Sequence, residues 1–401
     1  MPTFEEARRL ILDHVTALEP ERLPLVEAVG RVLVDDVIAP CDLPRWDNSA
    51  MDGYALRAAD AAGGRPLRVS GYVPAGSQAA ERVAAGTAAK ILTGAPLPAG
   101  ADAVAPVEET EEREGAVVVT APVRPGAHVR RRGEDVREGE TVLRRGAVIG
   151  PPEIALLAAF SLVSVPVVRR ARVAILSTGD ELVAPGEPLA PGLIHDTNGV
   201  ALAAAIRQLG AEPVSLGIAR DDRASLRALL AVGLEADALV TTAGVSMGDR
   251  DLVREVLGEL AVRQVFWKVD IKPGRPTAFA VLGEKPVFSL PGNPVSTLLT
   301  FDQFVRPALL RMMGHLHVLR PLLPAVLEED VARKPGRVGF VRVRLVRGPD
   351  GLRARSSGNQ ETGILKTMVQ ADGVAIIPAD RGALRKGEVV EVQVLRPEAA
   401  G

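Results

Sequence analysis

Cysteine and long apolar runs are both scarce in this chain of 401 residues. Cys41 is the only cysteine, so no internal disulfide framework can form, and a reducing, cytoplasmic location is expected. The longest apolar run spans residues 154–168 and is interrupted by Pro166. At about 15 residues it is shorter than the roughly 20 needed to cross a bilayer. The N-terminal residues are acidic and lack a signal-type apolar segment. We therefore expect a soluble protein with no membrane partner.

A large net charge and the familiar catalytic motifs are lacking as well. The formal net charge of −2 argues against a nucleic-acid partner. The sequence contains no Gly-x-x-x-x-Gly-Lys-Ser/Thr loop, no His-Glu-x-x-His and no Cys-x-x-Cys, which excludes the corresponding nucleotide and metal sites. The histidines are scattered: His14 is expected in the core, and His315 and His317 point to different faces of a helix end. Neither a histidine metal site nor Ser–His catalysis is indicated.

The chain is too long for a single hydrophobic core, and its pattern changes along its length. Thr3 and Glu6 form a capping box ahead of an amphipathic helix. A second helix is predicted at residues 154–162, and we expect the two helices to pack together. Between them, short strands broken by glycine and proline indicate a β-rich module. The predicted domains of this half are a split domain at 1–40 and 136–170 and an inserted β-rich domain at 41–135.

From residue 172 onward, predicted strands and helices alternate. This alternation indicates a central α/β domain at residues 171–318, with a mostly parallel sheet and right-handed crossovers. After Pro321 strands return, and they predict a small β-barrel at residues 319–401. The fold class is therefore a multidomain α/β plus β protein. The predicted strands of the α/β domain are 173–176, 213–218, 238–242, 264–269 and 287–290, and its helices are 198–209, 224–234, 251–260 and 295–313.

Small, acidic and cationic residues follow the strands of this α/β domain. Ligands gather at the carboxyl ends of such strands, so we expect one site there. Lys268, Lys272 and Arg275 surround a Pro-Gly turn and suit a phosphate or another oxyanion, while neighbouring carboxylates could hold Mg²⁺. An ordinary solvated loop surface is the alternative for each of these charges. The other candidate residues at this edge are Ser177, Gly179, Asp180, Glu181, Asp221, Gly244, Ser246, Gly248, Asp251, Pro273, Pro291, Gly292 and Asn293.

Two segments of the β-rich module carry residues that a plain β domain does not need. Residues 44–55 are polar and turn-forming yet contain Trp46 and Tyr54, and residues 93–98 form a loop stiffened by proline. Stiff loops that bear a hydroxyl or a carboxylate are frequent binding sites. From the residues alone, turns with a purely structural role remain an equal alternative.

Seven short motifs follow one another along nearly the whole chain. They are NSAMDGYA at 48–55, TGAPLP at 93–98, RRGED at 131–135, STGDEL at 177–182, GVS at 244–246, WK with KPG between 267 and 274, and PGNP at 291–294. In this order they closely resemble the signature set of the MoeA family, the molybdopterin molybdenumtransferases or molybdenum insertases, which are related to the gephyrin E domain. Seven motifs in one order are highly specific.

This resemblance implies a fold and a reaction. Members of the family have a split elongated domain that dimerises, an inserted β-rich domain, an α/β molybdopterin-binding domain and a C-terminal β-barrel. The reaction it implies takes molybdate and adenylated molybdopterin as substrates, uses a divalent cation such as Mg²⁺, and yields molybdenum cofactor and AMP. It also implies a cytoplasmic homodimer whose site is shared between subunits. A molybdopterin adenylyltransferase and downstream molybdoenzyme maturation proteins would be its partners.

Functional positions of the family carry over motif by motif. Lys268 and Lys272 would bind anionic groups of the substrates. The acids would hold the metal and orient the pyrophosphate for cleavage, and the implied metal ligands are Glu181, Asp221 and Asp251. In the barrel, Arg342 and Thr362 match positions that reach toward the cleft. The implied catalytic set is Asp52, Thr93, Asp135, Glu181, Asp221, Asp251, Lys268 and Lys272.

The chain departs from the family pattern at three places. Ala243 stands where a glycine is usual, Arg275 where lysine is common, and Thr362 where serine is expected. Two other functions fit the same fold, a molybdopterin adenylyltransferase and a non-catalytic scaffold. Adenylylation normally needs only the α/β domain, so the flanking motifs count against the first. The intact set of acids and cations counts against the second.

Overall fold

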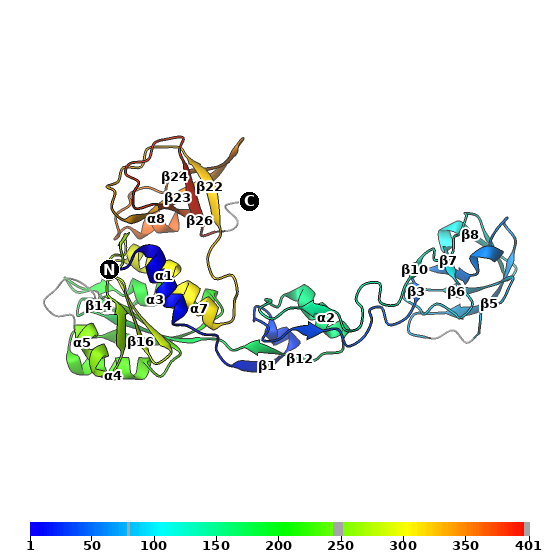
Figure 1. Ribbon diagram of the computed structural model, residues 1–401, viewed down its shortest axis with the longest axis horizontal. Helices are drawn as coiled ribbons and strands as arrows, with labels where there is room; N and C mark the ends of the chain where they lie inside the picture. Colours follow the sequence, from blue (N-terminus) through cyan, green and yellow to red (C-terminus); the bar gives the residue numbers. More distant parts are fainter. Residues whose placement is uncertain (78–80, 244–251, 397–401) are drawn as a thin grey trace. The chain divides into compact units, whose positions relative to one another are not determined.

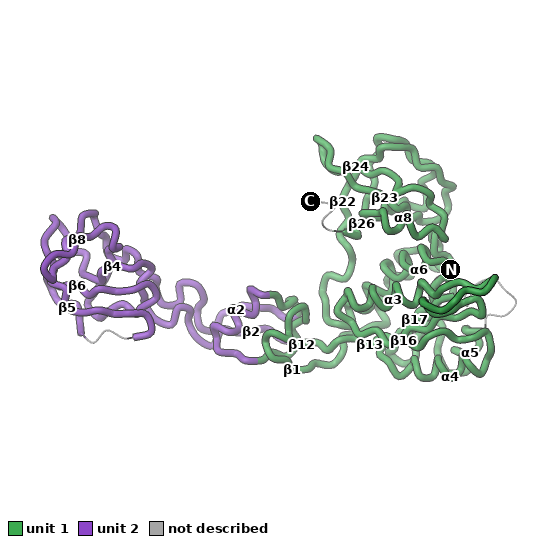
Figure 2. The backbone as a smooth tube through the Cα atoms, turned by 180° about the vertical axis from the view of Figure 1, so that it is seen from behind, with its two compact units in different colours: residues 1–34, 146–150, 164–401 green, residues 35–145, 151–163 purple. Residues whose placement is uncertain are grey.

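The computed structural model of the protein describes residues 1–77, 81–243 and 252–396. The chain divides into two compact units, which Figure 2 colours separately. Unit 1 comprises residues 1–34, 146–150 and 164–401, and unit 2 comprises residues 35–145 and 151–163. None of the described helices combines the length and apolar character of a membrane-spanning segment.

Unit 2 is built on a six-stranded sheet that buries side chains on both faces. Tyr54 and Leu56 belong to one apolar cluster and Ala55 to another, because successive side chains of a strand point to opposite faces. In sheet order the strands are β7 (Ala103–Pro106), β4 (Gly53–Leu56), β6 (Thr87–Ile91), β5 (Leu67–Val73), β9 (Ala116–Val119) and β8 (Thr110–Arg113). The remaining elements are the pairs β2 (Val37–Ile38) with β11 (Thr141–Leu143) and β3 (Asn48–Ser49) with β10 (Val129–Arg130), the short helices η2 (Ala58–Asp60) and η3 (Val107–Glu109), and α2 (Pro151–Ala159).

A second six-stranded sheet forms the centre of the α/β part of unit 1. Its strands all run in one direction except β20, which is antiparallel to both of its neighbours. Residues 173–178 are buried throughout, as expected for a parallel strand covered on both faces. In sheet order the strands are β16 (Glu212–Ala219), β13 (Arg172–Thr178), β17 (Ala238–Thr242), β21 (Lys285–Leu290), β20 (Ala278–Leu282) and β18 (Arg263–Phe266).

Helices cover both faces of this sheet (Figure 1). One face carries Val173 and Ile175, the other Ala174 and Leu176, so both sets of alternating side chains are packed. The helices on the first face are α3 (Thr197–Gln208), α6 (Pro294–Thr300) and α7 (Arg306–Met312), and those on the second are α4 (Arg223–Gly233) and α5 (Leu252–Glu259).

The structure corrects three details of the predicted α/β pattern. Strand β18 ends at Phe266 rather than at residue 269, and the antiparallel strand β20 had no counterpart in the prediction. The single helix expected at 295–313 is interrupted by a π-helical turn, η4 (Phe301–Val305). Pro307 lacks an N–H and cannot donate to the carbonyl group four residues earlier, which accounts for the interruption.

The N-terminal helix α1 (Phe4–Asp13) belongs to the α/β core. Thr3 and Glu6 form the expected capping box. The ring of Phe4 lies edge-on to Phe304 of η4 and to Phe340 of the C-terminal barrel, with centroids 5.8 and 5.2 Å apart. The apolar face of α1 is therefore covered within unit 1, whereas the helix near residues 154–162, which we expected to cover it, belongs to unit 2.

The C-terminal part of unit 1 is a closed five-stranded barrel. Strand β23 pairs with both β24 and β25, and this closes the circle through β22 and β26. A short strand of the α/β part, β19 (Ile271–Lys272), pairs with the start of β23. The barrel strands are β22 (Leu322–Leu327), β23 (Val338–Gly348), β24 (Gly351–Ser356), β25 (Gly373–Ile377) and β26 (Val389–Val394), with α8 (Leu365–Val369) before β25. Unit 1 also contains β1 (Pro20–Pro24) paired with β12 (Ser164–Val168), β14 (Leu182–Val183) paired with β15 (Ile194–His195), and η1 (Leu25–Ala28).

Candidate functional site

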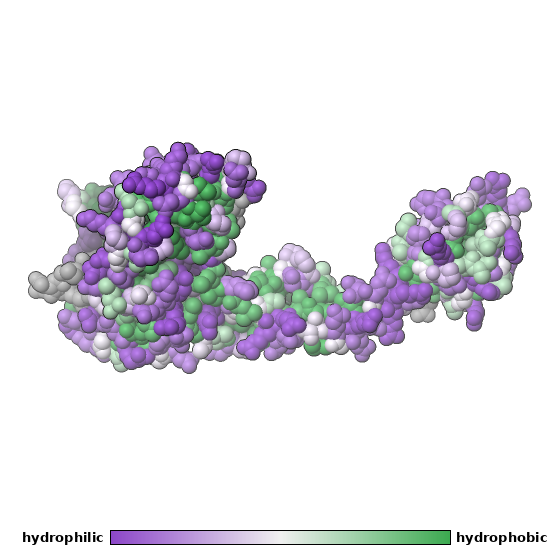
Figure 3. Space-filling model, turned by 45° about the horizontal axis from the view of Figure 1, so that its top comes forward, coloured by the Kyte–Doolittle hydropathy of each residue, from purple (hydrophilic) through white to green (hydrophobic). Residues whose placement is uncertain are grey.

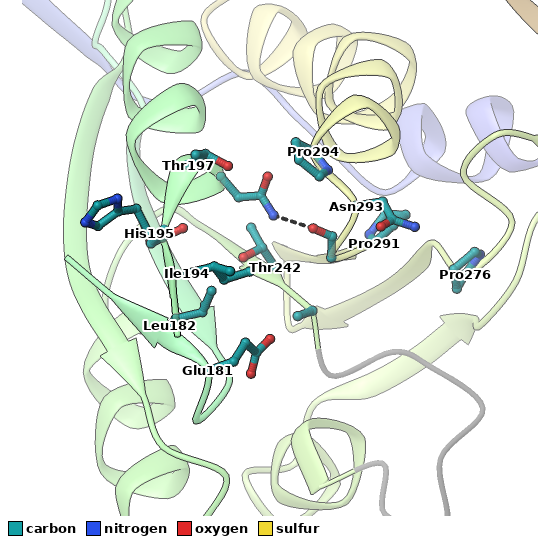
Figure 4. A pocket seen from close by; sticks show the side chains of 14 residues that line it. Glu181, Leu182, Ile194, His195, Thr197, Thr242, Pro276, Pro291, Asn293 and Pro294 are labelled. Atoms are coloured by element: carbon teal, nitrogen blue, oxygen red, sulfur yellow. Dashed lines mark hydrogen bonds between the residues drawn. The ribbon is translucent and has the colours of Figure 1, made fainter. Parts of the chain in front are cut away.

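A pocket of about 410 Å³ lies in unit 1, where β13, β17 and β21 end (Figure 4). Its volume falls within the roughly 300–1,000 Å³ of sites that bind small organic molecules. Four of the predicted residues line it, namely Glu181, Pro291, Gly292 and Asn293. The other lining residues are Leu182, Ile194, His195, Asp196, Thr197, Asn198, Thr242, Ala243, Pro276 and Pro294.

Glu181 reaches the pocket through a turn that only glycine fits. Gly179 has a φ of +145°, and a Cβ built on it would lie 2.4 Å from Oε2 of Glu181. Any other residue at this position would push the carboxylate aside. The absence of a side chain at Gly179 therefore leaves the space that the Glu181 carboxylate occupies.

Asn198 is a pocket residue that sequence reasoning missed. Its Nδ2 donates to the carbonyl oxygen of Gly292 at 2.8 Å, the dashed contact in Figure 4. The neighbouring Asp196 caps α3, since its carboxylate accepts the N–H of Gly199 at 2.9 Å. Residues 196–198 form the start of a helix that directly follows the strand ending at His195, and this position was the available signal for a polar pocket wall.

The floor of the pocket is formed at the end of β17. The hydroxyl of Thr242 donates to the buried hydroxyl of Ser177 at 3.4 Å. Ala243 follows with a φ of +65°, a conformation that favours glycine. A Cβ on Gly292 would lie 3.3 Å from the methyl group of Ala243, so this methyl narrows the pocket beside the 291–294 turn. The predicted site residues Gly244, Ser246, Gly248 and Asp251 lie outside the described residues.

Asp180 and Asp221 come together at the ends of β13 and β16. The N–H of Asp221 donates to Oδ1 of Asp180 at 3.2 Å, and Nη1 of Arg220 donates to the Asp180 carbonyl oxygen at 3.0 Å. Within the described part of the chain, no group of three or more His, Cys, Asp or Glu side chains is arranged to hold a metal ion. Of the implied metal ligands, only Glu181 and Asp221 can be located.

The predicted cations lie on the segment after β18. Pro276 lines the 410 Å³ pocket, whereas Lys268, Lys272 and Arg275 do not. The segment is held in place because the N–H of Val269 donates to the carbonyl oxygen of Arg275 at 3.1 Å. Lys272 and Arg275 are exposed. Their charges are thus available at the edge of the sheet, next to the pocket wall at Pro276. Pro273 lies between them.

Arg342 holds the loop of the barrel that meets the pocket wall. It is fully buried, and its Nη2 donates to the carbonyl oxygens of Asn359 at 2.9 Å and Glu361 at 3.2 Å. Thr362 follows in this loop, and its carbonyl oxygen accepts the N–H of Val295, at the start of α6, at 3.2 Å. Burial lowers the pKa of Arg342. Within the described structure, its Nε and Nη1 atoms have no hydrogen-bond partner.

In unit 2, Asp52 and Thr93 form one exposed group. Oδ1 of Asp52 accepts the backbone N–H of Thr93 at 2.7 Å and its hydroxyl at 2.8 Å. The backbone hydrogen bond, followed by the hydroxyl, lowers the pKa of Asp52 below its ordinary value. The carboxylate is therefore kept ionised.

Asp135 lies at the end of a segment that is anchored at several points. Its N–H donates to the carbonyl oxygen of Leu43 at 3.0 Å. Just before it, the N–H of Arg132 and Nη1 of Arg131 donate to Asp47 at 2.8 and 2.7 Å. These contacts, the backbone one foremost, lower the pKa of Asp47. These hydrogen bonds tie the arginine segment to the loop that contains Asp47, within unit 2.

Comparisons with known proteins give related matches in successive regions of the chain. The N-terminal region of MoeA (domains I and II) matches residues 2–161, a probable molybdopterin-binding domain matches 174–311, and the C-terminal region of MoeA (domain IV) matches 324–395. The "Molybdopterin molybdenumtransferase 2" of Mycobacterium tuberculosis is 38% identical over 98% of this chain and 99% of its own length. The "Molybdopterin molybdenumtransferase" of Haemophilus influenzae is 36% identical over 98% of both.

A solved structure, the molybdopterin biosynthesis MoeA protein from Pyrococcus horikoshii OT3, has the same fold. It is 34% identical, the alignment covers 98% of this chain and 100% of that one, and the TM-score is 0.84. With full-length relatives above 30% identity and all three regions matched in order, the chain belongs to the MoeA family, the molybdopterin molybdenumtransferases of molybdenum cofactor biosynthesis.

Proposed function

We propose that this chain inserts molybdenum from molybdate into adenylated molybdopterin and releases AMP. The observation that carries the proposal is the 410 Å³ pocket at the carboxyl edge of the α/β sheet, with the carboxylate of Glu181 in its lining and exposed cations on the segment beside it. Adenylated molybdopterin has a heterocycle, which needs a pocket, and a pyrophosphate, which needs cations beside that pocket. The names of the full-length relatives support the same reaction class.

In this proposal the pocket holds the pterin. Asn198 is fixed by its bond to Gly292, so its amide oxygen is oriented to accept a hydrogen bond from a ring N–H. Asp196, half a turn earlier, is tied to the helix N-terminus. Fixed polar groups of this kind select the orientation of a ligand without a reorganisation cost on binding.

Glu181 and Asp221 would hold Mg²⁺ together with Asp251. Carboxylate oxygens are the ligands that this ion prefers, so the donor set fits. When bound, the ion would neutralise charge on the pyrophosphate as it is cleaved. Asp180 contributes indirectly, because its carboxylate accepts the N–H of Asp221 and holds that loop against the end of β13.

Lys268, Lys272 and Arg275 would bind the phosphate groups or molybdate. Arg342 supports the same role, since a buried guanidinium with unpaired Nε and Nη1 atoms suits an anion. Through its bonds to the 359–361 segment, Arg342 also holds Thr362 against the start of α6.

Asp52, Thr93 and Asp135 would complete the site from a second copy of the chain. Unit 1 exposes several large apolar side chains near η1 and the 146–150 segment. Figure 3 shows hydrophobic residues gathered in patches among hydrophilic ones. Val26 is 78% and Leu316 70% exposed, so a homodimer would bury apolar surface there. A molybdopterin adenylyltransferase would supply the substrate, and molybdoenzyme maturation proteins would receive the product.

The test is AMP release by the purified protein from adenylated molybdopterin, with Mg²⁺ present and molybdate and tungstate titrated separately. Lys272→Ala is expected to reduce the rate at least ten-fold. Lys334→Ala, which removes an exposed lysine of the barrel, is the matched control and should keep the rate. Protein that makes adenylated molybdopterin from molybdopterin and ATP, but releases no AMP with molybdate, would identify an adenylyltransferase instead.

A further inference from the structure

The barrel packs on the α/β part through one row of residues that crosses β23, β25 and β26. Arg342 of β23 lies opposite Val374 of β25, and Val374 lies opposite Gln393 of β26. Residues that are directly opposite share a face of the sheet. Val374 belongs to the apolar core of the α/β part, whereas the next residue, Ala375, belongs to the core of the barrel. The row therefore lies on the outer face of the barrel, against the α/β part.

Gln393 ends this row in a buried amide–amide hydrogen bond. Its Oε1 accepts from Nε2 of Gln303 at 2.6 Å, and the two residues are 4% and 1% exposed. Oε1 of Gln303 accepts in turn from Nη2 of Arg8, in α1, at 3.0 Å. A buried amide that loses its partner is costly. One glutamine of η4 thus joins the N-terminal helix, the α/β part and the barrel.

A second contact braces the same corner of the barrel. Asp302, next to Gln303 in the π-helical turn, accepts from Nε of Arg320 at 2.7 Å. Nη1 of Arg320 also donates to the carbonyl oxygen of Val394, directly after Gln393, at 3.4 Å. Turns of the π type are frequent at functional sites. This one binds the last strand of the barrel both directly and through Arg320.

The opposite end of the row lies close to the 410 Å³ pocket. Thr362, in the loop that Arg342 holds, accepts the N–H of Val295 at 3.2 Å. Val295 belongs to the first turn of α6, which begins in the pocket wall. Gln303 lies roughly two helical turns further along, about 12 Å away at the usual rise per residue. The barrel is therefore attached to this helix at two polar points, with the apolar Val374 between the two ends of the row.

We propose that the Gln303–Gln393 pair positions the barrel for the reaction. The pair fixes the tilt of the barrel about Val374 and so sets where Arg342 and Thr362 stand at the pocket. Neither glutamine lines the pocket, so both act through the barrel and not on the substrate. The assignment rests on the proposed function, because that function places the substrate beside the barrel loop.

Hydrogen exchange at the Val295 N–H tests whether the pair holds the far contact. Gln393→Met removes the acceptor and leaves an unbranched side chain of similar length, and protection of this N–H should fall at least ten-fold. Gln393→Glu keeps an acceptor oxygen and should retain protection within two-fold. The matched control is Thr367→Val, which removes a buried 2.9 Å bond from the hydroxyl to the carbonyl oxygen of Ile364, and it should also stay within two-fold.

The proposal is overturned if protection in Gln393→Met is unchanged. It is also overturned if Gln393→Glu loses as much protection as Gln393→Met, because the acceptor oxygen would then have no role. Gln393→Leu, which lacks the acceptor as well, gives the same test if the methionine protein does not fold.

Steady-state kinetics separate positioning from a loss of folded protein. In the AMP-release assay, Gln393→Met should raise KM for molybdate at least five-fold, whereas a smaller folded fraction would lower kcat alone. A lower kcat with an unchanged KM would therefore reject the positioning role and leave the reaction standing. No AMP release by the unsubstituted protein would reject the proposed reaction itself, and exchange at Val295 would still decide whether the pair holds the barrel.

Discussion

Asp52 illustrates how two hydrogen bonds keep an exposed carboxylate ionised. It accepts two hydrogen bonds from Thr93, one from the backbone and one from the side chain. Both favour the charged form, so the pKa of Asp52 lies below its ordinary value. As pH falls, this carboxylate should remain ionised after ordinary aspartates have begun to protonate. Enzyme activity that depends on the charge of Asp52 should persist over the same pH range.

Thr93→Val tests this account. The backbone N–H of residue 93 remains and only the hydroxyl bond is lost, so the pKa of Asp52 is expected to rise part of the way toward its ordinary value. Carboxyl-carbon NMR during a pH titration measures this shift. Thr93→Ser keeps the hydroxyl and should leave the pKa near that of the unsubstituted protein. An unchanged pKa in Thr93→Val would show that the hydroxyl plays no part.

Some residues of the pocket were predicted from the sequence, and others were not. Glu181, Gly292 and Asn293 could be found because each lies in a short motif after a predicted strand. Asn198 could not, since its role depends on Gly292, which is 94 residues further along the chain. Ala243 was recognised as a departure, but only its φ of +65° and its place beside Gly292 show what the departure does.

Among the elements, helix α1 depends on one aromatic anchor. Phe4 is 3% exposed and packs against Phe304 and Phe340. Phe4→Ala should lower the free energy of unfolding by about 3–5 kcal/mol, the usual cost of removing a buried phenylalanine. Urea denaturation followed by circular dichroism measures the loss. Leu189→Ala, at a residue 53% exposed, should cost less than about 0.5 kcal/mol. Equal effects would mean that α1 is not part of the core.

A second element-level contact joins the segment before β13 to the start of β17. Arg169 donates to both carboxylate oxygens of Asp237, at 2.6 and 2.7 Å, and the N–H of Arg172 donates to it at 2.8 Å. Burial acts to raise the pKa of Asp237, but these donors outweigh it, and the pKa lies below its ordinary value. The contact therefore stabilises the fold when Asp237 is ionised.

This contact predicts a pH-dependent stability difference. Because the pKa is lowered in the folded state, the stabilisation is complete above the unfolded-state pKa of about 3.9. It is lost as pH falls through the lower folded-state value. Asp237→Asn should cost about 2 kcal/mol at pH 7, the scale of hydrogen bonds to a charged group. The cost should shrink below pH 4. Urea denaturation at several pH values measures it, and a constant difference would contradict the assignment.

For the whole molecule, the main prediction is a site shared between two copies. Asp52→Ala and Lys272→Ala proteins should each be inactive. If sites are shared, a mixed dimer has one site with both lesions and one with none, so unfolding and refolding an equal mixture should restore about a quarter of the unsubstituted activity. Two Asp52→Ala preparations mixed in the same way are the control and should stay inactive. No recovery despite demonstrated mixed dimers would place Asp52 and Lys272 in the same copy.

Much of the fold followed from local patterns. The capping box at Thr3 and Glu6, the buried strand at 173–176 and the return to strands after Pro321 are signals within a few residues, and the structure contains each of them. The interrupted helix at 301–305 and the antiparallel strand β20 were missed. Both depend on competition between backbone hydrogen bonds and packing, which apolar spacing does not record.

The sequence by itself determined the family, the order of its parts and the acids and cations that follow the strands, because motifs and periodicity are properties of neighbouring residues. Only the tertiary structure decided which side chains contact one another. It tied Asn198 to Gly292, buried Arg342 under the 359–361 segment and joined Gln303 to Gln393 of the barrel. The physical reason is that hydrogen bonds and cavities form between side chains that packing brings together, and packing depends on the whole chain.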